Sequence, residues 1–297
     1  MRHYLSLLRT KQWLKNFFVF APLIFARQLF QGESLLITLK AFAAFCLAAS
    51  VVYIVNDASD IAADRAHPQK KNRPLAAGTV SRAGAGVVLV LLVLLTSGIL
   101  TTMDIRFSAI LILYVLINLA YSFKLKEVVL LDVFIVAAGF MLRVLGGAYA
   151  IGVKVSSWIV LCSLFISLFL GFAKRRGELI QAQASGPASQ RKVLLLYRVD
   201  FIDQMLTIAA AGAVISYALY TVSPRTVEQF GTERLIYTTV FVLYGVFRYL
   251  YLVHMTPTTD NPTNAVTSDR TIVITGLLWI ATCIAVIYLT GSPFLGR

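Results

Sequence analysis

Long apolar runs recur along this chain and are separated by shorter polar segments. Eight windows of about 20 residues carry few charges; they cover residues 35–55, 83–102, 107–123, 128–151, 155–173, 201–222, 235–253 and 271–290. A helix rises about 1.5 Å per residue, so about 20 residues cross the hydrocarbon layer of a bilayer. The pattern therefore predicts eight transmembrane helices.

A ninth apolar run, residues 13–30, is interrupted by Lys15, Asn16, Pro22 and Arg27. No small-residue cleavage site follows its short apolar core, so we expect a retained first helix rather than a signal peptide. The predicted fold class is all-α and integral to the membrane. It has nine transmembrane helices in a single domain over residues 1–297.

The composition agrees with a membrane protein. Of the 297 residues, 58% are hydrophobic and 14% are charged, compared with roughly 25% charged residues in soluble domains. The net charge is +13, but the basic residues are spread among loops and no soluble domain organises them. We therefore expect membrane lipid, and no nucleic acid, as the partner of this charge.

Nine crossings would divide the loops into two sets, and the basic residues are unevenly distributed between them. The set that includes the N-terminus and residues 56–82 holds 18 of the 27 Lys and Arg residues. Because such residues are enriched on the cytoplasmic side, we expect a cytoplasmic N-terminus and a cytoplasmic site. The predicted location is the cell (inner) membrane.

Three acidic residues, Asp57, Asp60 and Asp64, lie at the end of the second apolar run. At about 100° per residue they would project from one face of a helix, with Asn56 beside them. Like charges on one face repel, so a cation should compensate them. Carboxylate oxygens are typical Mg²⁺ ligands, and we predict that the three aspartates are metal ligands and catalytic residues.

Basic residues follow this acidic cluster closely. Lys70, Lys71 and Arg73 could neutralise the oxygens of a diphosphate held by the metal, although a cytoplasmic loop with a helix cap would also explain them. Long loops in compact membrane proteins are often functional. We expect cytoplasmic active-site loops at about 56–82, 121–132 and 174–200.

Asp132, Val136, Gly139, Arg143 and Gly146 follow one another at intervals of four and three, so they form one helical stripe. Arg143 lies about 16 Å along the helix from Asp132, deep in the membrane, so it should face a polar cavity or a partner. A backbone carbonyl would serve equally well as that partner. Near the last span, Ser268 or Asp269 is the expected N-cap, and Asp269 and Arg270 are candidate rim residues.

Several strings resemble motifs of the UbiA superfamily of intramembrane prenyltransferases, and the resemblance covers nearly the whole chain. They are NDxxDxxxD at 56–64, RPLAAG at 73–78, KQWLKN at 11–16, the segment 121–126, KRRGEL at 174–179, and the DNP and SDR strings within 260–270. The resemblance implies a UbiA-type helical bundle and a transferase that uses Mg²⁺.

One departure from the superfamily pattern indicates which branch of the superfamily the chain resembles. Many members carry a second acidic motif, DxxxD, where this chain has only Asp132, preceded by Lys124 and Lys126. Two acidic motifs would hold a prenyl diphosphate through Mg²⁺, whereas lysines favour a lipid monophosphate. The chain is most similar to the branch that transfers phosphoribose.

This branch implies transfer of 5-phosphoribose from 5-phosphoribosyl 1-diphosphate to a polyprenyl phosphate, with release of pyrophosphate. A phosphate oxygen is already anionic near pH 7 and needs no general base. The predicted substrate-binding residues are Lys15, Asn16, Asn56, Lys70, Lys71, Arg73, Tyr121, Lys124, Lys126, Asp132, Arg143, Lys174 and Arg175.

Two other functions stay open at this point. A conventional prenyltransferase would move a polyprenyl group from its diphosphate to an aromatic or other polar acceptor, with the same fold and first motif. A lipid-phosphate transporter without chemistry would also suit an intramembrane arginine. Oligomeric state is open too, although membrane enzymes of this size often form homo-oligomers.

Overall fold

The computed structural model describes residues 2–66, 70–185, 192–255 and 268–289, and every regular element in these ranges is a helix. The chain divides into two compact units, Met1–Val155 and Ser156–Arg297. Each unit is described below by itself. The single domain stays a prediction.

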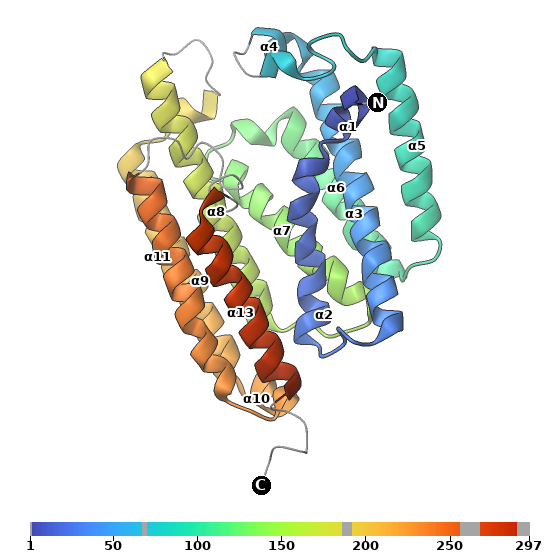
Figure 1. The fold of residues 1–297 in the computed structure, drawn as a ribbon. Helices are drawn as coiled ribbons and strands as arrows, with labels where there is room; N and C mark the ends of the chain where they lie inside the picture. The colour runs from blue at the N-terminus through green and yellow to red at the C-terminus, as the bar shows by residue number, and fades with distance from the viewer. Residues whose placement is uncertain (1, 67–69, 186–191, 256–267, 290–297) are drawn as a thin grey trace. The chain divides into compact units, whose positions relative to one another are not determined.

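The first unit is built around the long helix α3 (Gly32–Ser59), which packs against the N-terminal segment, α5 and α6 (Figure 1). The elements of this unit other than α3 are α1 (Arg2–Leu8), η1 (Thr10–Phe20), α2 (Ala21–Phe25), α4 (Ile61–Ala66), η2 (Lys70–Asn72), α5 (Arg82–Leu100), α6 (Ile105–Phe123), η3 (Leu125–Glu127) and α7 (Leu131–Ala150).

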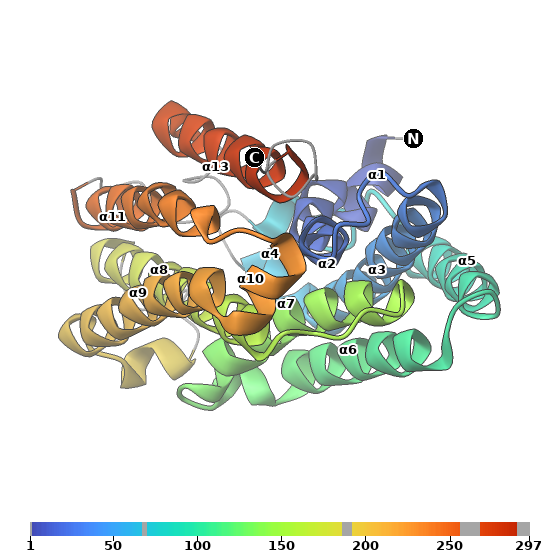
Figure 2. The same cartoon turned by 90° about the horizontal axis from the view of Figure 1, so that it is seen from below.

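In the second unit, α8 packs along α9, and α11 packs against α9 and α13 (Figure 2). Its elements are α8 (Ser157–Ser185), η5 (Lys192–Leu196), α9 (Val199–Val222), α10 (Pro224–Phe230), η6 (Arg234–Thr238), α11 (Thr239–Met255) and α13 (Arg270–Leu289).

Eight of the described helices are long and apolar enough to cross a membrane, and they correspond to the eight apolar windows of the sequence. The expected ninth span is built differently. Residues 13–25 fall in η1 and the five-residue helix α2, where Pro22 lies in the first turn, and residues 26–30 belong to neither helix. Neither helix is long enough to count as a span, so the nine-helix count and the cytoplasmic N-terminus stay predictions.

The N-terminal segment nevertheless runs antiparallel to α3. Trp13 Nε1 donates a hydrogen bond to Ser50 Oγ over 3.1 Å, and Asn16 Nδ2 donates to Cys46 Sγ over 3.1 Å. Further along, the Phe20 ring lies 5.5 Å from that of Phe42. The two segments are therefore antiparallel, and the polar contacts join them in the half of α3 that leads to Asp57.

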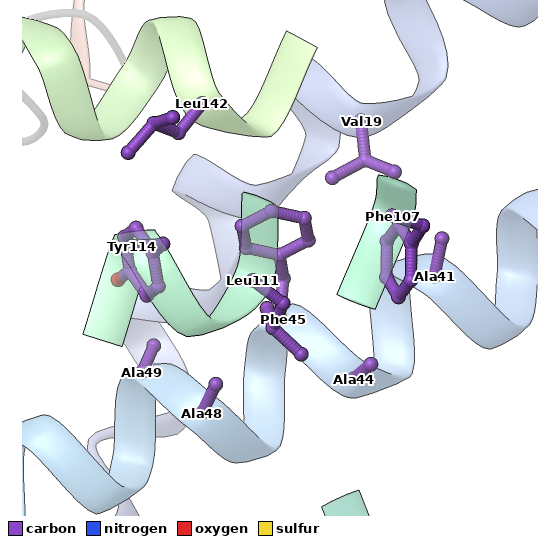
Figure 3. Packing of buried hydrophobic residues seen from close by; sticks show 10 residues of the cluster. All are labelled: Val19, Ala41, Ala44, Phe45, Ala48, Ala49, Phe107, Leu111, Tyr114 and Leu142. Atoms are coloured by element: carbon purple, nitrogen blue, oxygen red, sulfur yellow. The ribbon is translucent and has the colours of Figure 1, made fainter. Parts of the chain in front are cut away.

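The core of the first unit lies where α3, α6, α7 and η1 meet (Figure 3). Phe45 of α3 is fully buried and packs edge-on against Phe107 and Tyr114 of α6. Glycines of α7 permit the close approach of η1. A Cβ on Gly147 would lie 2.1 Å from the carbonyl oxygen of Val19, so only glycine fits there. This contact fixes α7 against the N-terminal segment.

The segments expected to be loops contain helix. The loop predicted from residue 174 is wrong at its start, because α8 continues to Ser185. Glu178 pairs with Lys174 over 3.9 Å and also with Arg175, and such pairs at intervals of three and four favour helix. Parts of these segments, residues 67–69 and 186–191, lie outside the described residues.

We predict that Gly147→Ala destabilises the protein by about 3 kcal/mol, because the added methyl group meets backbone rather than a movable side chain. Gly86→Ala is the matched control, since a Cβ there has no neighbour within 4 Å and alanine favours helix. Thermal unfolding in detergent measures both variants. Equal melting temperatures would contradict the close contact.

Candidate active site

The acidic segment bends where a continuous helix was expected. α3 ends at Ser59, Asp60 follows with φ −98° and ψ 9°, and α4 begins at Ile61. The prediction that all three aspartates share one face of a single helix is therefore wrong. Asp57 and Asp64 are buried, with 2% and 3% of their surface exposed, whereas Asp60 is only partly buried.

Arg73 bridges the two buried carboxylates. Its Nη1 donates to Asp64 Oδ2 over 2.7 Å and to Asp57 Oδ1 over 3.2 Å. One cationic nitrogen therefore lies between side chains from two helices. A buried carboxylate without a partner costs several kcal/mol, so this bridge compensates the repulsion predicted between the aspartates.

The RPLAAG string holds Arg73 in this position. Leu75 and Val80 are buried in a cluster with Leu7 and Ile54, which anchors the segment to the end of α3. Gly78 has φ +73°, a conformation that glycine adopts readily, and the chain turns there before α5. Hydrophobic burial on one side of the segment thus directs Arg73 toward the acids.

Arg9 is a second cation on Asp57. Its Nη2 donates to Asp57 Oδ1 over 2.5 Å, and its guanidinium lies 4.9 Å from the centre of the Tyr53 ring. Arg9 has φ 50° and ψ 47°, a left-handed conformation that costs of order 1 kcal/mol or more for a residue other than glycine. Ser50 stabilises this turn by donating to the carbonyl of Leu8 over 2.9 Å.

The third aspartate meets a cation from a distant part of the chain. Lys126 Nζ donates to the two carboxylate oxygens of Asp60 over 3.3 and 3.4 Å. Both side chains are partly exposed, at 23% and 29%. The segment 121–132 therefore contacts the acidic segment, and this contact is needed if both segments belong to one site.

The donor chemistry of this cluster suits a divalent metal, although its present contacts are with cations of the protein. Carboxylate oxygens are hard ligands for Mg²⁺, and the shared Arg73 nitrogen shows that Asp57 and Asp64 converge on one positive charge. Within the residues that the structure describes, no three acidic, His or Cys side chains form a group that could hold a metal ion. The three-ligand metal site stays a prediction.

Arg143 is buried within the first unit and joins three elements. Its Nε donates to Asn16 Oδ1 over 2.6 Å, its Nη2 to the Tyr114 hydroxyl over 2.8 Å, and its Nη1 to the Gly139 carbonyl over 2.8 Å. Its guanidinium also lies over the Tyr114 ring at 4.7 Å. The expected partner of this intramembrane cation is thus found, and it includes the backbone carbonyl that the sequence left open.

The structure also describes the remaining predicted site residues of the first unit. Asp132 is fully buried at the start of α7, and the side chain of Lys124 is exposed just after α6. The other predicted substrate-binding residues with described positions here are Lys15, Asn56, Lys70, Lys71 and Tyr121.

In the second unit, Lys174 and Arg175 lie in α8 and pair with Glu178. Their role in substrate binding stays a prediction. Asp269 is confirmed as the N-cap of α13, because it accepts from the backbone nitrogen of Ile272 over 2.9 Å. Arg248 donates to the same carboxylate over 2.8 Å, and this hydrogen bond lowers the pKa of Asp269. The rim assignment of Asp269 and Arg270 stays a prediction, and residues 260–267 lie outside the described ranges.

Sequence reasoning missed Arg9 and Tyr114. Arg9 lies two residues before the KQWLKN string, on the same predicted side of the membrane as the aspartates, and this position was a usable signal. Tyr114 gave no signal, because one tyrosine in an apolar helix is most often a packing residue. Only the fold brings its hydroxyl to Arg143.

Eight long apolar helices define an integral, multi-pass membrane protein. A family model described as the UbiA prenyltransferase family matches residues 17–265, and the chain belongs to this family. Two relatives are decaprenyl-phosphate phosphoribosyltransferases. The one from Corynebacterium glutamicum is 32% identical over 95% of this chain and 86% of its own length. The one from Mycolicibacterium smegmatis is 33% identical over 94% and 91%.

A solved UbiA homologue from Archaeoglobus fulgidus, bound to DMAPP and Mg²⁺, shares the fold. Its TM-score is 0.73 at 19% identity, over 96% of this chain and 98% of that one. Family membership and the named relatives establish that the chain is a transferase enzyme.

We predict that Tyr114→Phe destabilises the protein by about 1.5–3 kcal/mol, because a buried charged donor of Arg143 loses its acceptor. Tyr237→Phe is the control, since Tyr237 is 73% exposed. Unfolding in detergent compares the two. Equal stability of both variants would show that the hydrogen bond contributes nothing.

Proposed function

We propose that this protein transfers 5-phosphoribose from 5-phosphoribosyl 1-diphosphate to a polyprenyl phosphate at the cytoplasmic face of the membrane. One observation carries the proposal. Cations from three separate segments, Arg9, Arg73 and Lys126, converge on the aspartates of a single acidic motif. The names of the relatives that align over most of the chain support the same substrates.

The reaction needs a site for a strongly charged diphosphate. The bond between C1 of the ribose and the diphosphate oxygen breaks, a bond from C1 to an oxygen of the lipid phosphate forms, and pyrophosphate leaves. Stabilisation of the leaving group is the main catalytic requirement, since the attacking oxygen is already anionic. Arg9 and Arg73 supply guanidinium groups, which match phosphate oxygens in geometry.

Asp57 and Asp64 would hold Mg²⁺, with Asp60 nearby. When bound, Mg²⁺ would neutralise charge on the diphosphate and orient it. Asp57 and Asp64 suit this role because they are buried, fixed on two helices and already share one positive charge. Asn56 adjoins Asp57, and its amide oxygen is a further donor of the same kind.

The lysines of segment 121–132 favour a phosphate over a second metal. Lys126 lies beside Asp60, where a second acidic motif would otherwise contribute ligands, and Lys124 is exposed two residues earlier. A lipid monophosphate carries the charge that such lysines would bind. This arrangement supports a soluble diphosphate donor and a lipid phosphate acceptor.

We predict that Asp57→Asn and Asp64→Asn each reduce transfer at least about 100-fold, because each removes a metal ligand that acts on the leaving group. Asp104→Asn is the matched control. Asp104 is exposed and caps α6 by accepting from the Arg106 nitrogen over 2.7 Å, a role that asparagine also fills. The assay measures radiolabelled phosphoribose that becomes soluble in organic solvent.

A donor test separates the proposal from its rivals. Purified protein with Mg²⁺, polyprenyl phosphate and labelled phosphoribosyl diphosphate should yield a labelled lipid. Absence of that lipid, together with turnover of a polyprenyl diphosphate and an aromatic acid, would establish a conventional prenyltransferase. Lipid-phosphate transport that persists without Mg²⁺ in Asp57→Asn would favour a transporter.

A further inference from the structure

The acidic cluster is electrically balanced by the protein's own side chains. Among the described residues, Asp57, Asp60 and Asp64 each contact at least one cation, and these cations include Arg9, Arg73 and Lys126. The three negative charges thus meet at least three positive charges. A divalent metal entering alone would add two uncompensated charges to a largely buried cluster, which is unfavourable.

The two arginines are better placed to move than the buried aspartates with which they pair. The side chains of Arg9 and Arg73 are 22% and 24% exposed, whereas the side chains of Asp57 and Asp64 are 2% and 4% exposed. The aspartates are fixed at helix ends, and the arginines reach them on long side chains with several rotatable bonds. Arg9 pairs with Asp57 although its own backbone has a strained, left-handed conformation.

We infer that Arg9 and Arg73 are exchangeable counter-ions of the diphosphate site, and that Arg9 is a binding residue in it. They pair with Asp57 and Asp64 in the empty site and transfer to the diphosphate when it enters with the metal. The aspartates then bind the metal in their place. Metal and diphosphate therefore bind cooperatively, and neither binds well alone.

This inference rests on the proposed function only in that the substrate carries a diphosphate. It differs from an ordinary phosphate-binding role in one respect. Removing an arginine that only binds phosphate leaves the affinity for metal alone unchanged. Removing a counter-ion frees a carboxylate, so the affinity for metal alone rises while the affinity for diphosphate falls.

Binding of Mn²⁺ to the purified protein, followed by electron paramagnetic resonance, tests this directly. Inorganic pyrophosphate serves as the diphosphate probe. In the wild-type protein, pyrophosphate should tighten Mn²⁺ binding at least about tenfold, and Mn²⁺ should tighten pyrophosphate binding by the same factor, since coupling is reciprocal. Mn²⁺ affinity that is independent of pyrophosphate would overturn the inference without any variant.

The variants Arg73→Gln and Arg9→Gln should bind Mn²⁺ alone about three- to tenfold more tightly than the wild-type protein, because an opposing cation is gone. Pyrophosphate should bind more weakly, and the coupling should shrink. Arg106→Gln removes an equal charge from an exposed position at the start of α6 and should change neither affinity.

Unchanged or weaker Mn²⁺ affinity in both arginine variants would overturn the inference. Should Arg73→Gln fail to fold, Arg9→Gln and the wild-type coupling decide the question. Coupled binding of Mn²⁺ and pyrophosphate without phosphoribose transfer would uphold the counter-ions and refute the proposed donor. Absence of Mn²⁺ binding at every pyrophosphate concentration would refute both.

Discussion

The bridge from Arg73 to Asp57 and Asp64 is the contact on which the candidate site depends. Two carboxylates are buried at the end of an apolar helix bundle, where an unpaired charge would cost several kcal/mol. The bridge resolves that cost and joins α3 to α4 and to the segment before α5. Burial of Leu75 and Val80 beneath it makes the position of Arg73 a consequence of hydrophobic packing.

Two further contacts extend this arrangement through the first unit. The ion pair of Arg9 with Asp57 links the N-terminal segment to α3, and the ion pair of Lys126 with Asp60 links the segment after α6 to the acidic segment. Deeper in the unit, Arg143 ties η1, α6 and α7 together through Asn16 and Tyr114. The site is thus assembled from segments far apart in sequence, held by ion pairs at one end and a buried hydrogen-bond network further in.

Much of the helical framework and the acidic motif could be predicted, because membrane crossing demands about 20 apolar residues and a charged cluster departs plainly from that pattern. The bend at Asp60 could not be predicted, because the spacing of apolar residues does not reveal that one residue leaves the helical backbone conformation. The helix boundaries within residues 13–30 could not be predicted either, because apolar composition does not reveal that η1 ends at Phe20 and that the short helix α2 follows with Pro22 in its first turn. The sequence places Arg9 on the same predicted side of the membrane as the aspartates, but its pairing with Asp57, 48 residues away in the chain, is seen only in the fold.

A cryo-electron microscopy structure with phosphoribosyl diphosphate and Mg²⁺ would test the central claim most directly. The account predicts Mg²⁺ between Asp57 and Asp64, the diphosphate beside it, and the Arg73 guanidinium moved from the carboxylates to phosphate oxygens. Density for the diphosphate elsewhere, with Arg73 still bridging both aspartates, would contradict it.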